Sequence, residues 1–390
     1  MANGLVYVDS AMPGISRYLR DAHFHFKTPR GEWIKDPDEI ARIRALAIPP
    51  AYTDVWICPL ANGHLQAVGL DARRRKQYRY HPDWRTLKDE SKFEHMQEFG
   101  RALPRIRARV ARDLAEAAKK AANAPTREQV LAAIVRLLDT TYLRVGNEQY
   151  ASSNRSFGLT TLRRKHADVK GSALKLHFRG KSGVMHEASV DDVQVVRIVR
   201  RCQQLPGQEL FQYQDSEGAR HAISSSDVND YLHEAAGGSD TTRFTAKDFR
   251  TWHGTVQALE LTRLACTEND GDTRDAEGTQ AQRYSAREIL GAVARQLGNT
   301  PAVCKKAYVH PAVLALGTQL TGEAEELKAI WRRLADGKPS SRRLHAAEGR
   351  LIDFLRHQQR RRQRRATAAS GGDQSAASGR KTPSASKRTS

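Results

Sequence analysis

The spacing of apolar residues changes near residue 93, and this change is the sequence feature that most restricts the fold. Before it, short alternating segments such as HFHFKTP (23–29) and GHLQAVGL (63–70) are separated by Gly, Pro and Asn, a pattern typical of strands and turns. A short helical pattern at 36–50 interrupts them. After it, apolar residues recur at three- and four-residue spacing, as at Val130 and Ile134, which predicts helices. We therefore expect an α+β chain with a small β-rich N-terminal domain (1–92) and a larger, mostly α-helical domain (93–358).

One segment of the helical region departs from the helical pattern. In ALKLHFRGKSGVMHEASV (173–190), apolar Leu174, Leu176 and Phe178 alternate with polar residues, and GKSG (180–183) supplies a turn. This predicts a β-hairpin within the helical domain. An acidic, Gly-containing insertion at 266–280 is expected to be a mobile loop.

The chain is strongly basic. Its 390 residues carry a formal net charge of +20, of which the tail from Arg360 contributes +8 and the remaining body +12. A basic body indicates a polyanionic partner, and nucleic acid is the most common one. The tail, 359–390, is rich in Ser, Ala, Gly and basic residues and is expected to be disordered.

The cysteine spacing, the apolar runs and the N-terminal residues indicate the cellular compartment. The four cysteines lie far apart without a Cys-x-x-Cys pair, and no apolar run approaches the roughly 18 residues of a membrane span. We see no secretory signal at the N-terminus. These features predict a cytoplasmic protein with no disulfide framework and no membrane association.

Four segments carry residues able to act on a phosphate. YLRVGNEQY places Arg144 at a helix end, GKSG presents Lys181 at the hairpin tip, TAKDFRTWHG contains Arg250, and NTPAVCKKAY contains Asn299 and Tyr308. Taken singly, each residue is better explained by an ordinary structural role: a charge at a helix end, a solvent-exposed turn lysine, or a half-buried aromatic. GKSG also lacks the upstream spacing of a phosphate-binding P-loop.

Helix signals define the surroundings of the last segment. A capping box at 285–288 begins a helix, Gly298 ends it, and the Thr-Pro pair at 300–301 begins another. Asn299 is therefore expected at a helix junction, with Tyr308 two turns later.

In this order, Arg144, Lys181, Arg250 and Tyr308 resemble the active site of type IB DNA topoisomerases of the compact poxvirus and bacterial branch. The run AIPPAYTDVWICPLANGHLQAVGLDARRRKQYRYHPDW (47–84) also resembles that branch's DNA-binding domain, and the similarity covers roughly 15–355. One position departs from the poxvirus pattern: nine residues before the tyrosine, those enzymes have a histidine where this chain has Asn299. An asparagine amide can donate the same hydrogen bond to a phosphate, but without charge.

The resemblance implies a mechanism. Tyr308 is the expected nucleophile, which forms a 3′-phosphotyrosine; Arg144 and Arg250 clamp the phosphate, Lys181 is the general acid, and Asn299 donates a hydrogen bond. It further implies relaxation of positive and negative supercoils without ATP, cofactor or divalent metal. The partner is double-stranded DNA, held by a monomeric clamp with no obligate protein partner.

Residues for binding the duplex are also implied by the resemblance. On the predicted strand KQYRY, Tyr78 and Tyr80 face one side and alternate with basic residues. The matching positions of the poxvirus enzymes nominate a set of DNA contacts, and weaker candidates lie near the catalytic residues. The full set is Gln77, Tyr78, Tyr80, Tyr150, Lys305 and Lys306.

Two alternatives remain open. A tyrosine recombinase shares this chemistry, but such enzymes usually carry His-x-x-Arg at the second arginine, where this chain has Lys247 before Arg250. The other alternative is a non-catalytic architectural DNA-binding protein, which the composition alone allows. It predicts that Tyr308→Phe leaves every activity intact.

Overall fold

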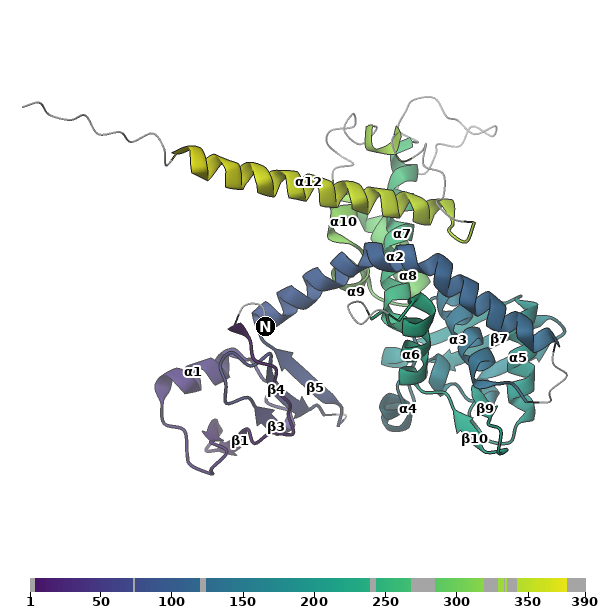
Figure 1. Ribbon diagram of the computed structural model, residues 1–390. Coiled ribbons are helices and arrows are strands. Elements are labelled where there is room, and N and C mark those ends of the chain that lie inside the picture. The colour runs from purple at the N-terminus through teal and green to yellow at the C-terminus, as the bar shows by residue number, and fades with distance from the viewer. Residues whose placement is uncertain are drawn as a thin grey trace, which may run out of the picture. The chain divides into compact units, whose positions relative to one another are not determined.

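The computed structural model describes residues 4–72, 74–119, 124–238, 243–267, 285–318, 329–332, 334 and 342–376. The chain divides into two compact units, Met1–Glu94 and His95–Ser390, and the division falls inside the long helix α2 (Pro82–Lys119) (Figure 1). It lies two residues from the position where the sequence pattern changes. The α+β class is confirmed.

The first unit is a five-stranded antiparallel sheet with strand order β2-β1-β3-β4-β5. Its strands are β1 (Ile15–Arg20), β2 (His23–Lys27), β3 (Thr53–Ile57), β4 (Leu65–Leu70) and β5 (Lys76–Tyr80). The segment expected to be helical forms α1 (Pro37–Ala45), which begins at the N-cap Asp36. Because side chains alternate across a strand, one face of the sheet is apolar and packs against α1. This core consists of Ile15, Phe26, Ile43, Ile57 and Ala67.

The second unit is mostly helical and is organised around α3 (Arg127–Thr141). The run Val130–Leu138 of this helix is buried except for Arg136. It packs against α5 (Val193–Gln204), α6 (Ser225–Ala236) and α7 (Ala246–Thr267). The other main helices are α4 (Glu148–Asn154), α8 (Ala286–Leu297), α9 (Pro301–Ala307), α10 (Pro311–Thr318) and α12 (Ala346–Ala376).

The expected hairpin forms with β7 (Ala173–Arg179) and β8 (Met185–Val190), and β6 (Ala167–Lys170) adds a third strand that the sequence pattern did not indicate. Leu174, Leu176 and Phe178 are buried and the residues between them are exposed, as the alternation predicts. A separate two-stranded sheet consists of β9 (Gln212–Gln214) and β10 (Arg220–Ala222).

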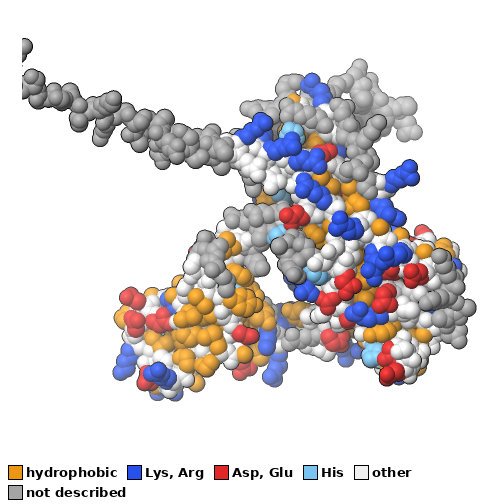
Figure 2. Space-filling model, viewed as in Figure 1, with side chains coloured by type: hydrophobic (Ala, Val, Ile, Leu, Met, Phe, Trp, Pro, Cys, Tyr) orange, Lys and Arg blue, Asp and Glu red, His pale blue; other side chains and the backbone are white. Residues whose placement is uncertain are grey.

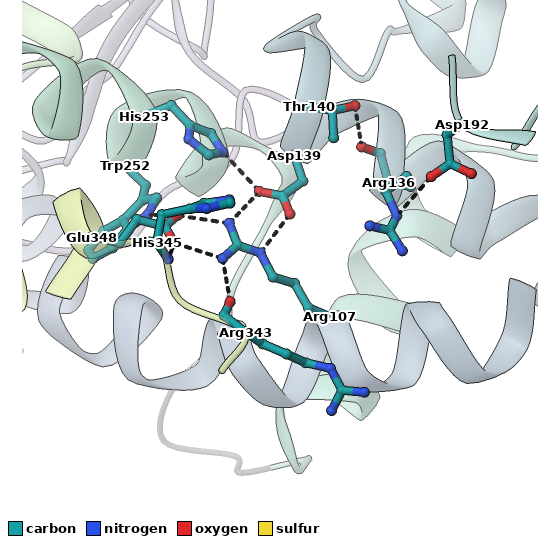
Figure 3. Close-up of polar contacts among 10 residues, drawn as sticks. All are labelled: Arg107, Arg136, Asp139, Thr140, Asp192, Trp252, His253, Arg343, His345 and Glu348. Carbon is teal, nitrogen blue, oxygen red and sulfur yellow. Dashed lines mark hydrogen bonds and ion pairs between the residues drawn. The ribbon is translucent and has the colours of Figure 1, made fainter. Parts of the chain in front are cut away.

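A buried ionic network ties four helices of this unit together (Figure 3). Arg107 of α2 donates to both carboxylate oxygens of Asp139 of α3, at 2.8 and 3.0 Å, and to both of Glu348 of α12, at 2.7 and 2.8 Å. From α7, the Trp252 indole donates to Glu348 at 3.0 Å, and His253 Nε2 lies 3.0 Å from Asp139. The network thereby fixes α12 against α7, which lie side by side in Figure 1.

Helix α12 continues to Ala376, past residue 358, where we expected the catalytic domain to end. Arg, Gln and Ala are strong helix formers, so a helix can continue here without burying a core. Residues 377–390, the rest of the basic tail, lie outside the described residues, as does nearly all of the acidic insertion at 266–280. Within the described part of the chain, no helix has the length and apolar character needed to span a membrane.

Candidate active site

Arg144 lies in the connection between α3 and α4, not at a helix end as expected. Helix α3 ends at Thr141, and the following connection runs directly beside residues 158–160. The Leu159 amide donates to the Arg144 carbonyl at 2.9 Å. Gly158 permits this approach, because a Cβ at that position would lie 2.5 Å from the backbone nitrogen of Gly146.

Arg250 points from α7 into the same region and is only 3% exposed. Its Nη1 donates to the carbonyl of Tyr142, and its Nη2 donates to the carbonyl of Leu297 at 2.6 Å. Its buried Nε has no hydrogen-bond partner among the described residues. Burial and the neighbouring charge of Arg144 lower the pKa of Arg250, with Tyr308 acting in the opposite direction.

Asn299 occupies the expected junction between α8 and α9. Gly298 ends α8 in the left-handed region at φ 57°, and Thr300 caps α9. The side-chain oxygen of Asn299 accepts a hydrogen bond from Arg144 Nη2 at 2.6 Å. The junction therefore places an amide directly beside a guanidinium.

Tyr308 follows the last residue of α9, and helix α7 holds its backbone. Thr255 Oγ1 donates to the Tyr308 carbonyl at 3.1 Å, and a Cβ on Gly254 would lie 3.0 Å from the same oxygen. The guanidinium carbon of Arg250 lies 5.0 Å from the centre of the Tyr308 ring. The half-buried phenol is thus held beside the buried arginine.

The structure therefore brings Arg144, Arg250, Asn299 and Tyr308 together from three separate segments, the last of which carries both Asn299 and Tyr308. Neither arginine forms an ion pair with a carboxylate in the described part of the chain. Arg107, by contrast, is neutralised by two carboxylates. A buried cation without a counter-ion is costly, so the two arginines form a site suited to an anion. Their planar forks match the oxygens of a phosphate, and a tyrosine hydroxyl lies alongside.

Comparison with known proteins agrees with this geometry. Residues 81–333 match the family described as eukaryotic DNA topoisomerase I, catalytic core, and residues 23–71 match the bacterial DNA topoisomerase IB N-terminal domain. The chain belongs to the type IB DNA topoisomerase family. A relative is the DNA topoisomerase 1B of Acanthamoeba polyphaga mimivirus, 30% identical over 284 residues, which are 71% of this chain and 80% of the relative. The DNA topoisomerase 1 of Mycosarcoma maydis is 29% identical over 127 residues, 32% of this chain and 11% of that protein.

Membership in this family identifies the chain as a DNA topoisomerase, an isomerase that acts on DNA. It favours the topoisomerase interpretation over a tyrosine recombinase and over a non-catalytic DNA-binding protein. The bacterial N-terminal domain match agrees with the compact branch that the sequence motifs indicate.

Lys181 of this topoisomerase has no described hydrogen bond with the other four residues. It begins a short 3₁₀ turn (Lys181–Gly183) at the hairpin tip, is exposed, and has no hydrogen bond or ion pair with any residue that the structure describes. The turn itself is well defined, because the Gly180 amide donates to the Val184 carbonyl at 2.7 Å. The structure thus places the expected general acid on a hydrogen-bonded turn, without a hydrogen bond to any described residue.

The expected DNA-contact residues of the first unit divide between two faces of β5. Tyr78 and Tyr80 are 45% and 37% exposed on one face, with stacked rings 6.2 Å apart. Gln77 is half-buried on the other face, where its amide donates to Asp71 at 3.0 Å. The two tyrosines are therefore more accessible to a DNA duplex than Gln77, whose amide is already hydrogen-bonded.

The candidates of the second unit are all exposed. Tyr150 lies on α4, and Lys305 and Lys306 lie in the last turn of α9. On the face shown in Figure 2, basic and acidic side chains of this unit are intermingled. The positive excess is therefore not gathered into one patch on that face.

Sequence reasoning missed several residues that build the site. Tyr142 and Leu297 contribute only carbonyl oxygens, which leave no signal in a sequence. His186 of β8 does leave one, because it occupies an inward-facing position opposite the buried Phe178. A polar residue at an inward position of an alternating strand is a recognisable exception to the pattern.

Proposed function

We propose that this topoisomerase relaxes positive and negative supercoils by cutting one DNA strand, allowing rotation and resealing it. The observation that supports this proposal is the pair of arginines without carboxylate partners beside Tyr308 and Asn299. Such a site favours a phosphate with a tyrosine hydroxyl next to it. The family comparison supports the same reaction class.

In the proposed reaction, Tyr308 Oη attacks the scissile phosphorus and releases its phenolic proton to water. A bond forms from phosphorus to Oη while the bond from phosphorus to O5′ breaks, which leaves a 3′-phosphotyrosine. Lys181 Nζ transfers a proton to O5′ as it leaves, and religation reverses these transfers. One phosphate ester replaces another, so no ATP is consumed.

The negative charge that develops on the phosphoryl oxygens is held by the chain's own residues. Arg144 and Arg250 are charged at every physiological pH and supply two guanidinium forks. The Asn299 amide adds a neutral donor. Because two fixed positive charges already face the phosphate, we propose that the reaction requires neither a divalent metal nor another cofactor.

The remaining proposals concern binding. Tyr78 and Tyr80, with Tyr150, Lys305 and Lys306, are proposed to contact a duplex that a single copy of the chain encloses as a clamp, and Gln77 is retained as a weaker candidate. No obligate protein partner is proposed, and the expected location is the cytoplasm in association with the nucleoid.

The decisive experiment is relaxation of a supercoiled plasmid in EDTA without ATP. Wild type is expected to relax both signs of supercoil and, when denatured during the reaction, to leave protein covalently attached to the 3′-phosphate end of the nicked strand. Tyr308→Phe keeps the ring beside Arg250 but removes the nucleophile, so activity should fall by on the order of 10⁴-fold or more.

Failure of the wild type to relax plasmid under these conditions would contradict the proposal. A Tyr308→Phe variant with full DNA binding and unchanged activity would instead support an architectural role. Formation of strand-exchange products between two duplexes would support the recombinase alternative.

A further inference from the structure

His186 lies between two parts of the candidate active site. It belongs to β8, and its ring stacks on that of Phe178 of β7, with ring centres 5.5 Å apart. A Cβ on Gly180 would lie 2.4 Å from His186 Cδ2, and a Cβ on Gly298 would lie 2.5 Å from its Cε1. The imidazole therefore fills the space between two glycines, one on each side.

These two glycines identify what the ring joins. Gly180 immediately precedes Lys181, and Gly298 immediately precedes Asn299. Because each glycine lacks a Cβ, its backbone can lie closer to the His186 ring than the backbone of any other residue type could. His186 thus connects the turn that carries the proposed general acid with the helix junction that holds Arg144.

The electrostatic surroundings favour a neutral ring. Burial, together with the positive charges of Arg144 and Arg250, lowers the pKa of His186. No hydrogen bond from a described residue counters these effects on the His186 pKa. The histidine therefore adds no third positive charge beside the arginines. Its contacts with both glycines are steric contacts.

We propose that His186 is a positioning residue for proton transfer: it docks the Lys181 turn against the α8–α9 junction. This inference rests on the proposed function of Lys181 as general acid. Lys181 has a long side chain on an exposed turn, so the place of its ammonium group depends on where the turn is held. A displacement of about 1 Å at a catalytic group can cost about 10²-fold in rate.

The test compares two leaving groups in single-turnover cleavage by the full chain. A duplex containing a cleavage site mapped with the wild type is prepared with oxygen or with sulfur at the bridging 5′ position. A thiolate leaves without protonation, so the sulfur substrate does not need a general acid. His186→Ala is expected to cleave the oxygen substrate about 10²-fold more slowly than wild type, and the sulfur substrate within about threefold of it. Duplex affinity should not change.

Two variants serve as standards for these rates. Lys181→Ala should show the same rescue by sulfur, because it removes the acid itself. Arg144→Ala should remain slow on both substrates, because its charge is needed whichever atom leaves. A His186→Ala variant that is equally slow on both substrates would overturn the inference.

A second variant is expected to displace the Lys181 turn while His186 itself is unchanged. Gly180 has φ −96°, which any residue can adopt, so Gly180→Ala introduces a clash with the His186 ring without backbone strain. It should reproduce the His186→Ala defect and its rescue, and the double variant should be no slower than His186→Ala alone, since the ring is then absent. His177→Ala, an exposed histidine of the same hairpin, should behave as wild type.

The outcomes separate this inference from the proposed function. If wild type cleaves neither substrate, the proposed function fails. If wild type cleaves both and sulfur rescues Lys181→Ala but not His186→Ala or Gly180→Ala, the proposed function stands and the positioning role is wrong. Additive losses in the double variant would also contradict it.

Discussion

Asn299 stands where poxvirus relatives have a histidine, and its side-chain oxygen accepts a hydrogen bond from Arg144 at 2.6 Å. In the proposed reaction, Asn299 therefore acts partly through the arginine that it contacts. A hydrogen bond to a charged group contributes about 1.5–3 kcal/mol, or about 10–100-fold in rate. We expect Asn299→Ala to slow single-turnover cleavage by that amount. Arg250→Ala should be slower still, because it removes a buried charge from the proposed phosphate site.

Asn299→Asp separates the two functions of this side chain. Aspartate keeps an oxygen that can accept from Arg144, but it places a negative charge beside the phosphate. We expect this variant to cleave more slowly than Asn299→Ala. Cleavage at the wild-type rate would show that Asn299 acts only by orienting Arg144, and equal losses in Asn299→Ala and Arg250→Ala would contradict the neutral-donor role.

At the residue scale, what the sequence predicts depends on whether the position has a local signal. Gly298, Thr300 and Pro301 are standard helix-end residues, so the location of Asn299 and Tyr308 could be predicted. Arg144 could not be placed, because α3 ends at Thr141 and the left-handed residue that follows it is Tyr142 (φ 58°), not a glycine or asparagine that would indicate a helix end. The contacts of Arg250 with carbonyl oxygens depend on tertiary structure alone.

Among the elements, the Arg107 network explains how four helices hold the site. Burial raises the pKa of Asp139, but hydrogen bonds from His253 and Arg107 outweigh it and hold that pKa well below its usual value. Arg107 likewise lowers the pKa of the buried Glu348. A carboxyl with a lowered pKa in the folded state stabilises the protein above its unfolded pKa of about 4, and this contribution is lost as the pH falls through the folded pKa.

We therefore expect wild type to lose stability as the pH falls below about 5, and Asp139→Asn to be less stable at neutral pH by about 3–5 kcal/mol. The variant should also lose less stability on acidification, because it lacks one of the linked carboxyls. Denaturant unfolding at several pH values measures both effects. Asp168→Asn, at an exposed strand position paired with Lys170, is the matched control and should change neither. Parallel pH profiles for wild type and Asp139→Asn would contradict the assignment.

At the scale of the whole molecule, the two-part organisation could be predicted because the predominant apolar period changes near residue 93, from two to about 3.6 residues, and the period is a property of local sequence. The third strand of the hairpin sheet, β6, could not be predicted in the same way. It is four residues long and only half-buried, so its pairing with β7 leaves little pattern. Helix α12 extends to Ala376, into the segment whose composition predicts disorder, because Arg and Ala favour helices.

The basic tail offers the last prediction, which concerns affinity for DNA. A chain ending at Gln359 keeps the buried residues of α12, the last of which are Phe354 and Leu355, and lacks nine of the 64 basic residues. For each phosphate that the tail no longer neutralises, the dependence of log K on log salt should fall by about 0.9. We expect a shallower slope for the truncated chain in duplex-binding titrations between about 50 and 200 mM salt, with unchanged thermal unfolding. Replacing the five arginines of 360–365 by glutamine in the full chain keeps its length and should shift the slope in the same direction. An unchanged slope in both variants would mean that the tail does not bind the duplex, and that the basic body alone determines the salt dependence.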